Sequence, residues 1–96
     1  MIAIRRLEWD VWNIEHIAKH EVTPEEVEEV CFGTPVLRDS YKGRVLAVGR
    51  TVAGRMLAVA LDPEPGEQGV AYPVSARPAS RRERQRYADA RGGEQS

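Results

Sequence analysis

The chain of 96 residues is 42% hydrophobic and 30% charged, has a formal net charge of −1 and contains one cysteine. This composition is typical of a single small globular domain. It argues against a disordered chain and against a protein that coats nucleic acid through its net charge. No apolar run approaches the ~18 residues of a membrane span, and charged residues from Arg5 onward interrupt any signal-peptide core. Since Cys31 has no partner for an internal disulfide, we expect a cytoplasmic protein with no membrane association.

The first predicted elements are an edge strand and a helix. Residues 2–9 are rich in β-branched and large apolar side chains, which favours a strand at the edge of a sheet. Asp10 is a suitable N-cap for a helix that runs to about His20, because apolar residues recur there at helical spacing. The two tryptophans of this segment, Trp9 and Trp12, are predicted to lie in the core.

A second helix has the clearest local signal in the chain. Thr23 and Glu26 have the spacing of a capping box, and Pro24 occupies the first helical position. The helix is predicted to end at the Gly-Thr-Pro sequence of residues 33–35. Cys31 lies on its apolar stripe and is predicted to be a small buried side chain.

The middle of the chain predicts four strands joined by short turns. The expected strands cover residues 35–39, 44–50, 55–62 and 70–76. Their connections are too short for a parallel crossover, so neighbouring strands should pair antiparallel. The runs VLAV and MLAVAL lack strict alternation, which indicates central strands covered at least in part on both faces. Pro73 has no backbone donor and predicts a bulge or an unpaired position in the last strand.

A C-terminal helix is predicted because Ser80 and Glu83 repeat the spacing of a capping box and the helical pattern continues to about Ala90. Residues 92–96 are expected to form a flexible tail, which leaves residues 1–91 as one domain. The predicted fold is α+β: a small twisted antiparallel sheet packed on one side with two N-terminal helices and one C-terminal helix.

The near-zero net charge hides an uneven distribution. Residues 1–31 contain three basic and eight acidic side chains, whereas residues 77–96 contain six arginines and three acidic side chains. Arginine accounts for twelve of the fourteen basic residues, and guanidinium groups bind phosphate and carboxylate in a bidentate manner. The C-terminal helix therefore has three interpretations: a solvated surface, a contact for an acidic partner protein, or a contact for a nucleic-acid backbone.

The helical wheel of the C-terminal helix separates its arginines from a narrow remaining stripe. The arginines of the two flanks are Arg81, Arg82, Arg84 and Arg86. The remaining stripe consists of Glu83, Tyr87 and Ala90 and is poor in large apolar groups. This helix should therefore be held only weakly by packing.

Three more arginines lie where an anion could be bound. Arg77 lies between the last strand and the start of the C-terminal helix, whose free N–H groups attract anions. Arg50 and Arg55 flank the turn at residues 51–54. If the hairpin pairs as predicted, these two charges approach each other and need an anion or an acid between them. Exposed hairpin ends without a ligand are the alternative.

His16 and His20 are one helical turn apart, which is a spacing that can bind a metal. No third ligand is evident in the sequence, so we predict no metal and no cofactor. Either histidine is also suited to proton transfer, because imidazole titrates near neutral pH, or to packing between a helix and the sheet.

Four motifs, taken in their order along the chain, resemble the BrnT family of bacterial toxins. They are EWD at residues 8–10, HIAKHEVTPEEVEEV at 16–30, VGRTVAGRMLAV at 48–59 and SARPASRRERQRY at 75–87. The resemblance implies a compact relative of the RelE-type fold and a ribonuclease toxin that is neutralised by a BrnA-like antitoxin. Such an antitoxin carries a ribbon-helix-helix segment, so DNA would be contacted only through the antitoxin. A homodimer or a 2:2 complex is a possible assembly.

The resemblance also implies a set of site residues. The matching positions are Lys19, His20, Arg50, Arg77, Glu83, Arg84 and Tyr87. The implied reaction is RNA cleavage by the RNA's own 2′-hydroxyl without a metal, and Arg50 and Arg77 are expected to form an electrostatic clamp.

The other implied roles concern proton transfer and RNA binding. His20 is expected to transfer protons with help from Lys19, and Glu83 is the alternative base. Tyr87 is expected to stack on a base or bind a phosphate. The arginines expected to contact the RNA backbone are Arg55, Arg81, Arg82, Arg84 and Arg86.

The chain departs from the family pattern at several positions. Glu21 replaces the usual glycine after the K-H pair, and Lys42 and Gly43 replace an acidic pair. Tyr72 and Pro73 replace an arginine and an isoleucine, and the loss of that arginine removes one potential phosphate contact. The alternative function is a catalytically weak or inactive toxin homologue that acts as a protein-binding module and co-repressor with its antitoxin. A domain whose arginines serve solubility alone is a third interpretation.

Overall fold

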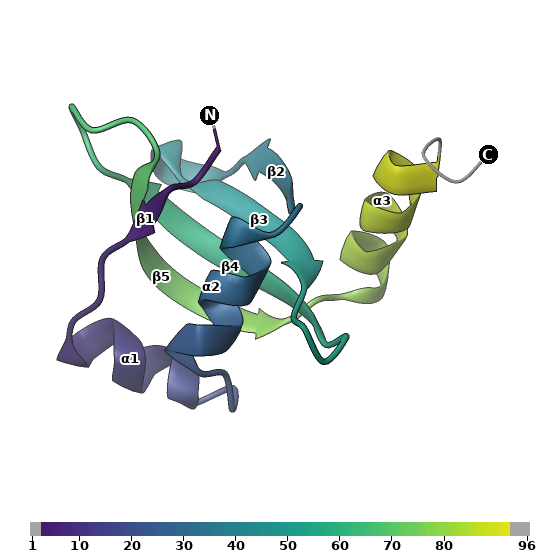
Figure 1. Cartoon of the computed structure of the whole chain (residues 1–96), viewed down its shortest axis with the longest axis horizontal. Coiled ribbons are helices and arrows are strands. Elements are labelled where there is room, and N and C mark those ends of the chain that lie inside the picture. Colours follow the sequence, from purple (N-terminus) through teal and green to yellow (C-terminus); the bar gives the residue numbers. More distant parts are fainter. Residues whose placement is uncertain (1–2, 93–96) are drawn as a thin grey trace.

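A five-stranded sheet organises the structure, which is a computed structural model in which residues 3–92 are described (Figure 1). The elements along the chain are β1 Arg6–Leu7, α1 Val11–Ala18, α2 Pro24–Phe32, β2 Val36–Asp39, the 3-10 turn η1 Tyr41–Gly43, β3 Val45–Arg50, β4 Met56–Pro63, β5 Val70–Pro78 and α3 Arg81–Gly92. The predicted α+β class and the predicted order of helices and strands are confirmed. Of the predicted tail, residues 93–96 lie outside the described part of the chain.

The sheet has the strand order β1-β5-β4-β3-β2 and is mixed, so the prediction of a purely antiparallel sheet is wrong. Strands β2 to β5 pair antiparallel with their neighbours, but β1 lies parallel to β5. The strand predicted at residues 2–9 shortens to Arg6–Leu7, and residue 2 lies outside the described range. Parallel pairing is possible because the long segment between β1 and β5 supplies a crossover that a short turn cannot supply.

Helices contact both faces of the sheet, so the expectation of all three helices on one side is also wrong. In Figure 1, α3 stands beside the sheet, apart from α1 and α2. Helices α1 and α2 pack on one face over the main core, whose fully buried members include Ile17, Val27, Val30, Leu57, Val59 and Leu61. Helix α3 packs on the other face, where Tyr87 lies against Val48, Ala58 and Ala79. Because successive side chains of a strand point to opposite faces, the apolar runs of β3 and β4 contribute to both clusters, as predicted.

Both N-terminal helices begin at their predicted caps. The Asp10 carboxylate accepts a hydrogen bond from the Asn13 N–H at 3.0 Å, and the Asn13 side-chain oxygen accepts one from the Asp10 N–H at 2.9 Å. Thr23 and Glu26 form the second reciprocal pair. These bonds satisfy N–H groups that the first turn of a helix leaves without partners. Helix α1 ends at Ala18, somewhat earlier than predicted.

The prediction that both tryptophans are buried is wrong for Trp12. Trp9 is half-buried and its indole N–H donates to Glu28 at 3.0 Å, whereas Trp12 is 55% exposed. Among its eight residues, α1 buries Asn13 and Ile17, which lie on a different side of this short helix. Trp12 stacks instead on His16, with ring centroids 4.7 Å apart.

The predicted bulge in the last strand is confirmed. Ala60 pairs with Ser75, but Leu61 pairs with Pro73, so Val74 is an extra residue in β5. The bulge places Pro73, which cannot donate a backbone hydrogen bond, where the regular ladder is interrupted.

Cys31 is buried in the main core, as predicted. Its burial, with a smaller effect of the Glu28 charge, raises the pKa of the thiol to about 12. Cys31 is therefore an unreactive packing residue at neutral pH. Within residues 3–92, none of the helices combines the length and the apolar character needed to cross a bilayer.

Candidate nucleic-acid interface

One row of polar and aromatic side chains of α3 faces the rest of the protein, and most of the arginines of this helix lie in solvent. Glu83, Tyr87 and Arg91 are half-buried, and no described residue of the helix is fully buried. The arginines predicted for the two flanks, Arg81, Arg82, Arg84 and Arg86, are all exposed. Ala90 was predicted on the sheet-facing stripe but is exposed, because the row at intervals of four residues continues from Glu83 through Tyr87 to Arg91.

Arg77 and Glu83 form a bidentate ion pair at the start of α3. The Arg77 Nη1 and Nη2 donate to the two Glu83 carboxylate oxygens at 2.7 and 2.9 Å. The Ser80 N–H also donates to Glu83, and the Glu83 N–H donates to the Ser80 hydroxyl, which confirms the predicted capping box. The hydrogen bonds from Arg77, opposed by desolvation, lower the pKa of Glu83 to about 2, and the bond to Glu83 raises the pKa of Arg77.

This ion pair changes the roles expected of both residues. A carboxylate with a pKa of about 2 accepts protons poorly near neutral pH, so Glu83 is a weak candidate for the general base. The Arg77 charge is already matched by a carboxylate, and the first turn of α3 is already capped. Arg77 is therefore less available to a phosphate than its position in the sequence indicates.

A hollow of about 550 Å³ lies between α3 and the end of the β3–β4 hairpin. Its lining residues are Arg50, Gly54, Met56, Arg84, Tyr87, Ala88 and Arg91. We call this feature the arginine hollow, because three guanidinium groups line it and no acidic residue of the described chain does. Sequence reasoning predicted Arg50, Arg84 and Tyr87 as site residues, and the structure brings these three together.

The arginines of the hollow differ in how firmly they are held. Arg84 donates to the Ala79 carbonyl at 3.0 Å. Arg91 donates to the Thr34 hydroxyl at 2.9 Å, and its guanidinium lies 5.4 Å from the centre of the Tyr87 ring. Within the described chain, the Arg50 guanidinium makes no hydrogen bond and no ion pair, so it is the one most available to a ligand.

Arg91 was not predicted as a site residue. The signal that could have identified it is its position four residues after Tyr87, which places both on the same helical row. Its partner Thr34 lies far away in the sequence, in the segment between α2 and β2, and no local pattern indicates that contact.

Arg55 is not the cross-strand partner of Arg50, which pairs with Met56, so the two charges do not face each other as expected. The Arg55 guanidinium donates to the Glu26 carboxylate at 3.2 Å and to the carbonyls of His20 and Glu21 at 3.1 and 2.7 Å. Arg55 therefore ties the β3–β4 hairpin to the junction between α1 and α2, whereas Arg50 lines the arginine hollow together with residues of α3. The fold thus supplies acceptors for three of the five N–H donors of this guanidinium, which leaves fewer of them for RNA.

Lys19 and His20 lie at the junction that Arg55 holds, and neither lines the arginine hollow. Lys19 caps the end of α1, and both side chains are exposed. The structure thus does not bring the predicted proton-transfer residues to the predicted phosphate-binding residues. Searched over the described residues, the chain also contains no group of three histidine, cysteine or acidic side chains placed to bind a metal.

Tyr72 occupies the position at which the family pattern has an arginine. Its hydroxyl donates to the Asp10 carboxylate, with distances of 2.9 and 3.0 Å to the two oxygens. The residue therefore fastens β5 to the start of α1.

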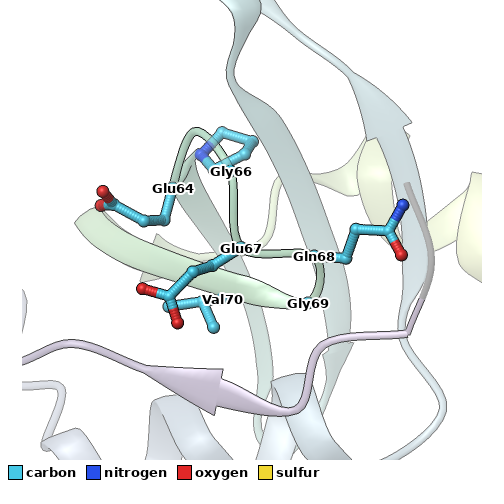
Figure 2. A pocket seen from close by; sticks show the side chains of 7 residues that line it. Glu64, Gly66, Glu67, Gln68, Gly69 and Val70 are labelled. Atoms are coloured by element: carbon cyan, nitrogen blue, oxygen red, sulfur yellow. The ribbon is translucent and has the colours of Figure 1, made fainter.

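A larger hollow lies at the opposite end of β4, under the loop between β4 and β5 (Figure 2). It measures about 860 Å³ and is lined by residues of the segment 63–70, including Glu64 and Glu67. Glu67 pairs with Arg6 at 3.1 Å. An open hollow with acidic side chains repels a polyanion, so of the two hollows charge favours the smaller arginine hollow as the candidate site for a nucleic acid.

Comparison of the sequence with models of known protein families and with curated proteins gives no match. The resemblance to BrnT toxins therefore rests on the four sequence motifs. What the structure adds is the α+β fold and the arginine hollow.

Proposed function

We propose that the protein is a ribonuclease toxin that binds single-stranded RNA on the α3 side of its sheet. The observation that carries the proposal is the arginine hollow, which three arginines line and which no acidic residue of the described chain lines. Exposed arginines along α3 continue the positive surface beyond the hollow. A backbone of evenly spaced phosphates matches such a surface better than a single acidic side chain does.

The proposed reaction is attack of a 2′-oxygen on the adjacent phosphorus. A new P–O bond forms, the bond to the 5′-oxygen breaks, and the products carry a 2′,3′-cyclic phosphate and a 5′-hydroxyl. The 2′-hydroxyl gives up one proton and the leaving oxygen takes one, so no other reactant is consumed. Arg50, Arg84 and Arg91 would stabilise the extra negative charge on the phosphorane.

Tyr87 is the lining residue best suited to give a proton to the leaving oxygen, because among the described side chains of the hollow its hydroxyl is the one proton donor besides the arginines. His20 and Lys19 would take part only if the RNA also reaches the α1–α2 junction. In this proposal Glu83 positions Arg77 and is not the base.

The test is incubation of the purified chain with single-stranded RNA in EDTA, with the products resolved for cyclic phosphate. We expect Arg50→Gln and Tyr87→Phe each to slow cleavage by about tenfold or more. Arg44→Gln is the matched control, because Arg44 precedes the other end of β3 and makes no side-chain bond within the described residues. Absence of cleavage, or equal cleavage by all variants, would reject the proposal. His20→Ala tests separately whether the α1–α2 junction takes part.

The second candidate is a protein-binding module that acts as a co-repressor with a BrnA-like antitoxin. The observation that favours it is the exposed apolar surface of α1, where Val11, Trp12 and Ile14 are 71%, 55% and 40% exposed. DNA would be contacted through the ribbon-helix-helix segment of the antitoxin. Co-expression with the neighbouring gene, followed by mass measurement, tests for a 1:1 or 2:2 complex. A stable complex whose released toxin cleaves no RNA would favour this candidate over the ribonuclease.

A further inference from the structure

Helix α3 is joined to the sheet mainly by polar contacts. Tyr87 supplies the apolar contact, and none of the described helical residues is buried. Its polar contacts include the ion pair of Glu83 with Arg77 of β5. Arg84 donates to Ala79, just after β5, and Arg91 donates to Thr34, between α2 and β2. Elements held by few buried apolar contacts open at low free-energy cost, so the position of α3 should respond to a ligand.

The arginine hollow contains charges from both partners of this weak contact. Arg50 comes from the end of β3, whereas Arg84 and Arg91 come from α3. Arg50 and Arg84 make no ion pair with a described residue, and like charges on the two sides of this contact repel. An anion with several acceptor oxygens would remove this repulsion and bind the sheet and the helix at the same time.

We infer that the arginine hollow is a clamp for one phosphodiester with its attached nucleoside, and that occupancy fastens α3 to the sheet. The hollow of about 550 Å³ is within the size range of small-ligand sites, so it has room for more than a phosphate group. Met56, Tyr87 and Ala88 give it an apolar side against which a base can lie. The identity of the natural ligand as RNA rests on the proposed function, but the clamp itself does not.

The probe for this inference is a 2′-O-methyl dinucleotide, which contains one phosphodiester and cannot be cleaved by 2′-hydroxyl attack. Hydrogen–deuterium exchange of the full chain should show that the probe slows exchange in α3 by about threefold or more. Inorganic phosphate should require about tenfold higher concentrations for the same effect, because it lacks the nucleoside. If phosphate and the dinucleotide act at equal concentrations, the nucleoside does not contribute to binding, and that part of the inference is overturned. If the probe leaves hydrogen exchange in α3 unchanged, the clamp is overturned.

The matched variants are again Arg50→Gln and Arg44→Gln. Arg50 makes no bond that the fold needs, so its replacement should leave thermal unfolding unchanged while weakening probe binding by about tenfold. Arg44→Gln removes the same charge outside the hollow and should change binding less than about twofold. If both variants lose the same affinity for the probe, the probe responds only to the net charge of the protein. The arginine hollow would then not be its binding site.

The two proposals fail in different ways. If the uncleavable probe slows hydrogen exchange in α3 but the protein does not cleave RNA, the clamp is supported and the ribonuclease activity is rejected. Cleavage that depends on Tyr87 but no effect of the probe on α3 would keep the ribonuclease and reject the clamp.

Discussion

Asn13 is a polar residue that occupies a fully buried position in α1. Its side-chain amide donates to the carbonyls of Glu8 and Pro73, both at 3.0 Å, and its oxygen caps the helix through the Asp10 N–H. The side chain thereby connects the end of β1 and the start of α1, which are close in the sequence, to the bulge of β5, which is 60 residues away. Every polar atom of the side chain is used, which is the condition under which burial of an amide is tolerated.

Replacement of this residue should destabilise the fold. We expect Asn13→Ala to lower the free energy of unfolding by about 2–3 kcal/mol, because two carbonyls and one N–H lose their partner. Urea denaturation measures the change. Glu15→Ala, on the exposed side of the same helix, is the control and should stay within about 0.5 kcal/mol. Equal effects of the two would contradict the role of Asn13.

The lowered pKa of Glu83 implies that the free energy of unfolding depends on pH. Its pKa falls from 4.5 in the reference state to about 2 in the fold, so its contribution is complete above pH 4.5 and disappears as the pH falls towards 2. We expect Glu83→Gln to cost about 0.5–1 kcal/mol at neutral pH, since the Arg77 side of the pair is exposed. Urea denaturation between pH 2 and 7 should show the two proteins converging at the acid end. A difference that stays constant over this range would rule out the ion pair as its source.

At the scale of elements, the cap patterns predicted the helix starts well. Asp10, Thr23 and Ser80 each begin a helix where the sequence indicates, because capping is a local interaction within four residues. The errors concern long-range contacts. The pairing of β1 with β5, the side of the sheet that α3 covers and the exposure of Trp12 all depend on segments far apart in the chain.

In the candidate site, too, residues were predicted but their contacts with distant segments were not. Arg50, Arg84 and Tyr87 were predicted and do meet in one hollow. Sequence alone gave no means of seeing that the Arg55 guanidinium is taken up by Glu26, or that Arg91 is positioned by Thr34. An arginine whose guanidinium is hydrogen-bonded within the protein is less free to bind a ligand. For Arg55 and Arg91, those hydrogen-bonding partners lie in segments that are far away in the sequence.

Arg55 and Arg50 offer a direct comparison on one hairpin. We expect Arg55→Lys to lower the free energy of unfolding by about 1–2 kcal/mol, because an ammonium cannot reproduce the forked bonds to Glu26 and two carbonyls. Arg50→Lys should change it by less than about 0.5 kcal/mol, since no bond of the described structure is lost. Chemical denaturation of both variants measures this contrast, and the reverse order would refute the assignment of Arg55 to the fold.

For the molecule as a whole, the uneven distribution of charge along the sequence becomes a separation of acidic and basic side chains in space. The acidic N-terminal part forms α1 and α2 on one face of the sheet, and the arginine-rich C-terminal part forms α3, which contacts the other face through Tyr87. Figure 1 shows α3 apart from the two N-terminal helices. A chain with a net charge of −1 can therefore present a positive surface to a polyanion.

This surface should make RNA binding dependent on salt. If three to six phosphates are contacted, the logarithm of the association constant should fall with the logarithm of salt concentration with a slope of about −2 to −4. Fluorescence anisotropy with labelled, uncleavable single-stranded RNA measures the slope. Arg50→Gln should reduce its magnitude by about 0.7, while Arg44→Gln should leave it unchanged. A slope near zero would exclude a phosphate-backbone contact.

The parallel pair of β1 and β5 also has a consequence for how the chain assembles during synthesis. The first strand to be made has no partner until residues 70 and 71 exist, although β2, β3 and β4 can already form hairpins. Until then Ile4 and Leu7, which are buried in the finished molecule, have no β5 to cover them. Contacts between distant segments form late and slowly. The N-terminal strand is thus expected to be the last part of the sheet to close.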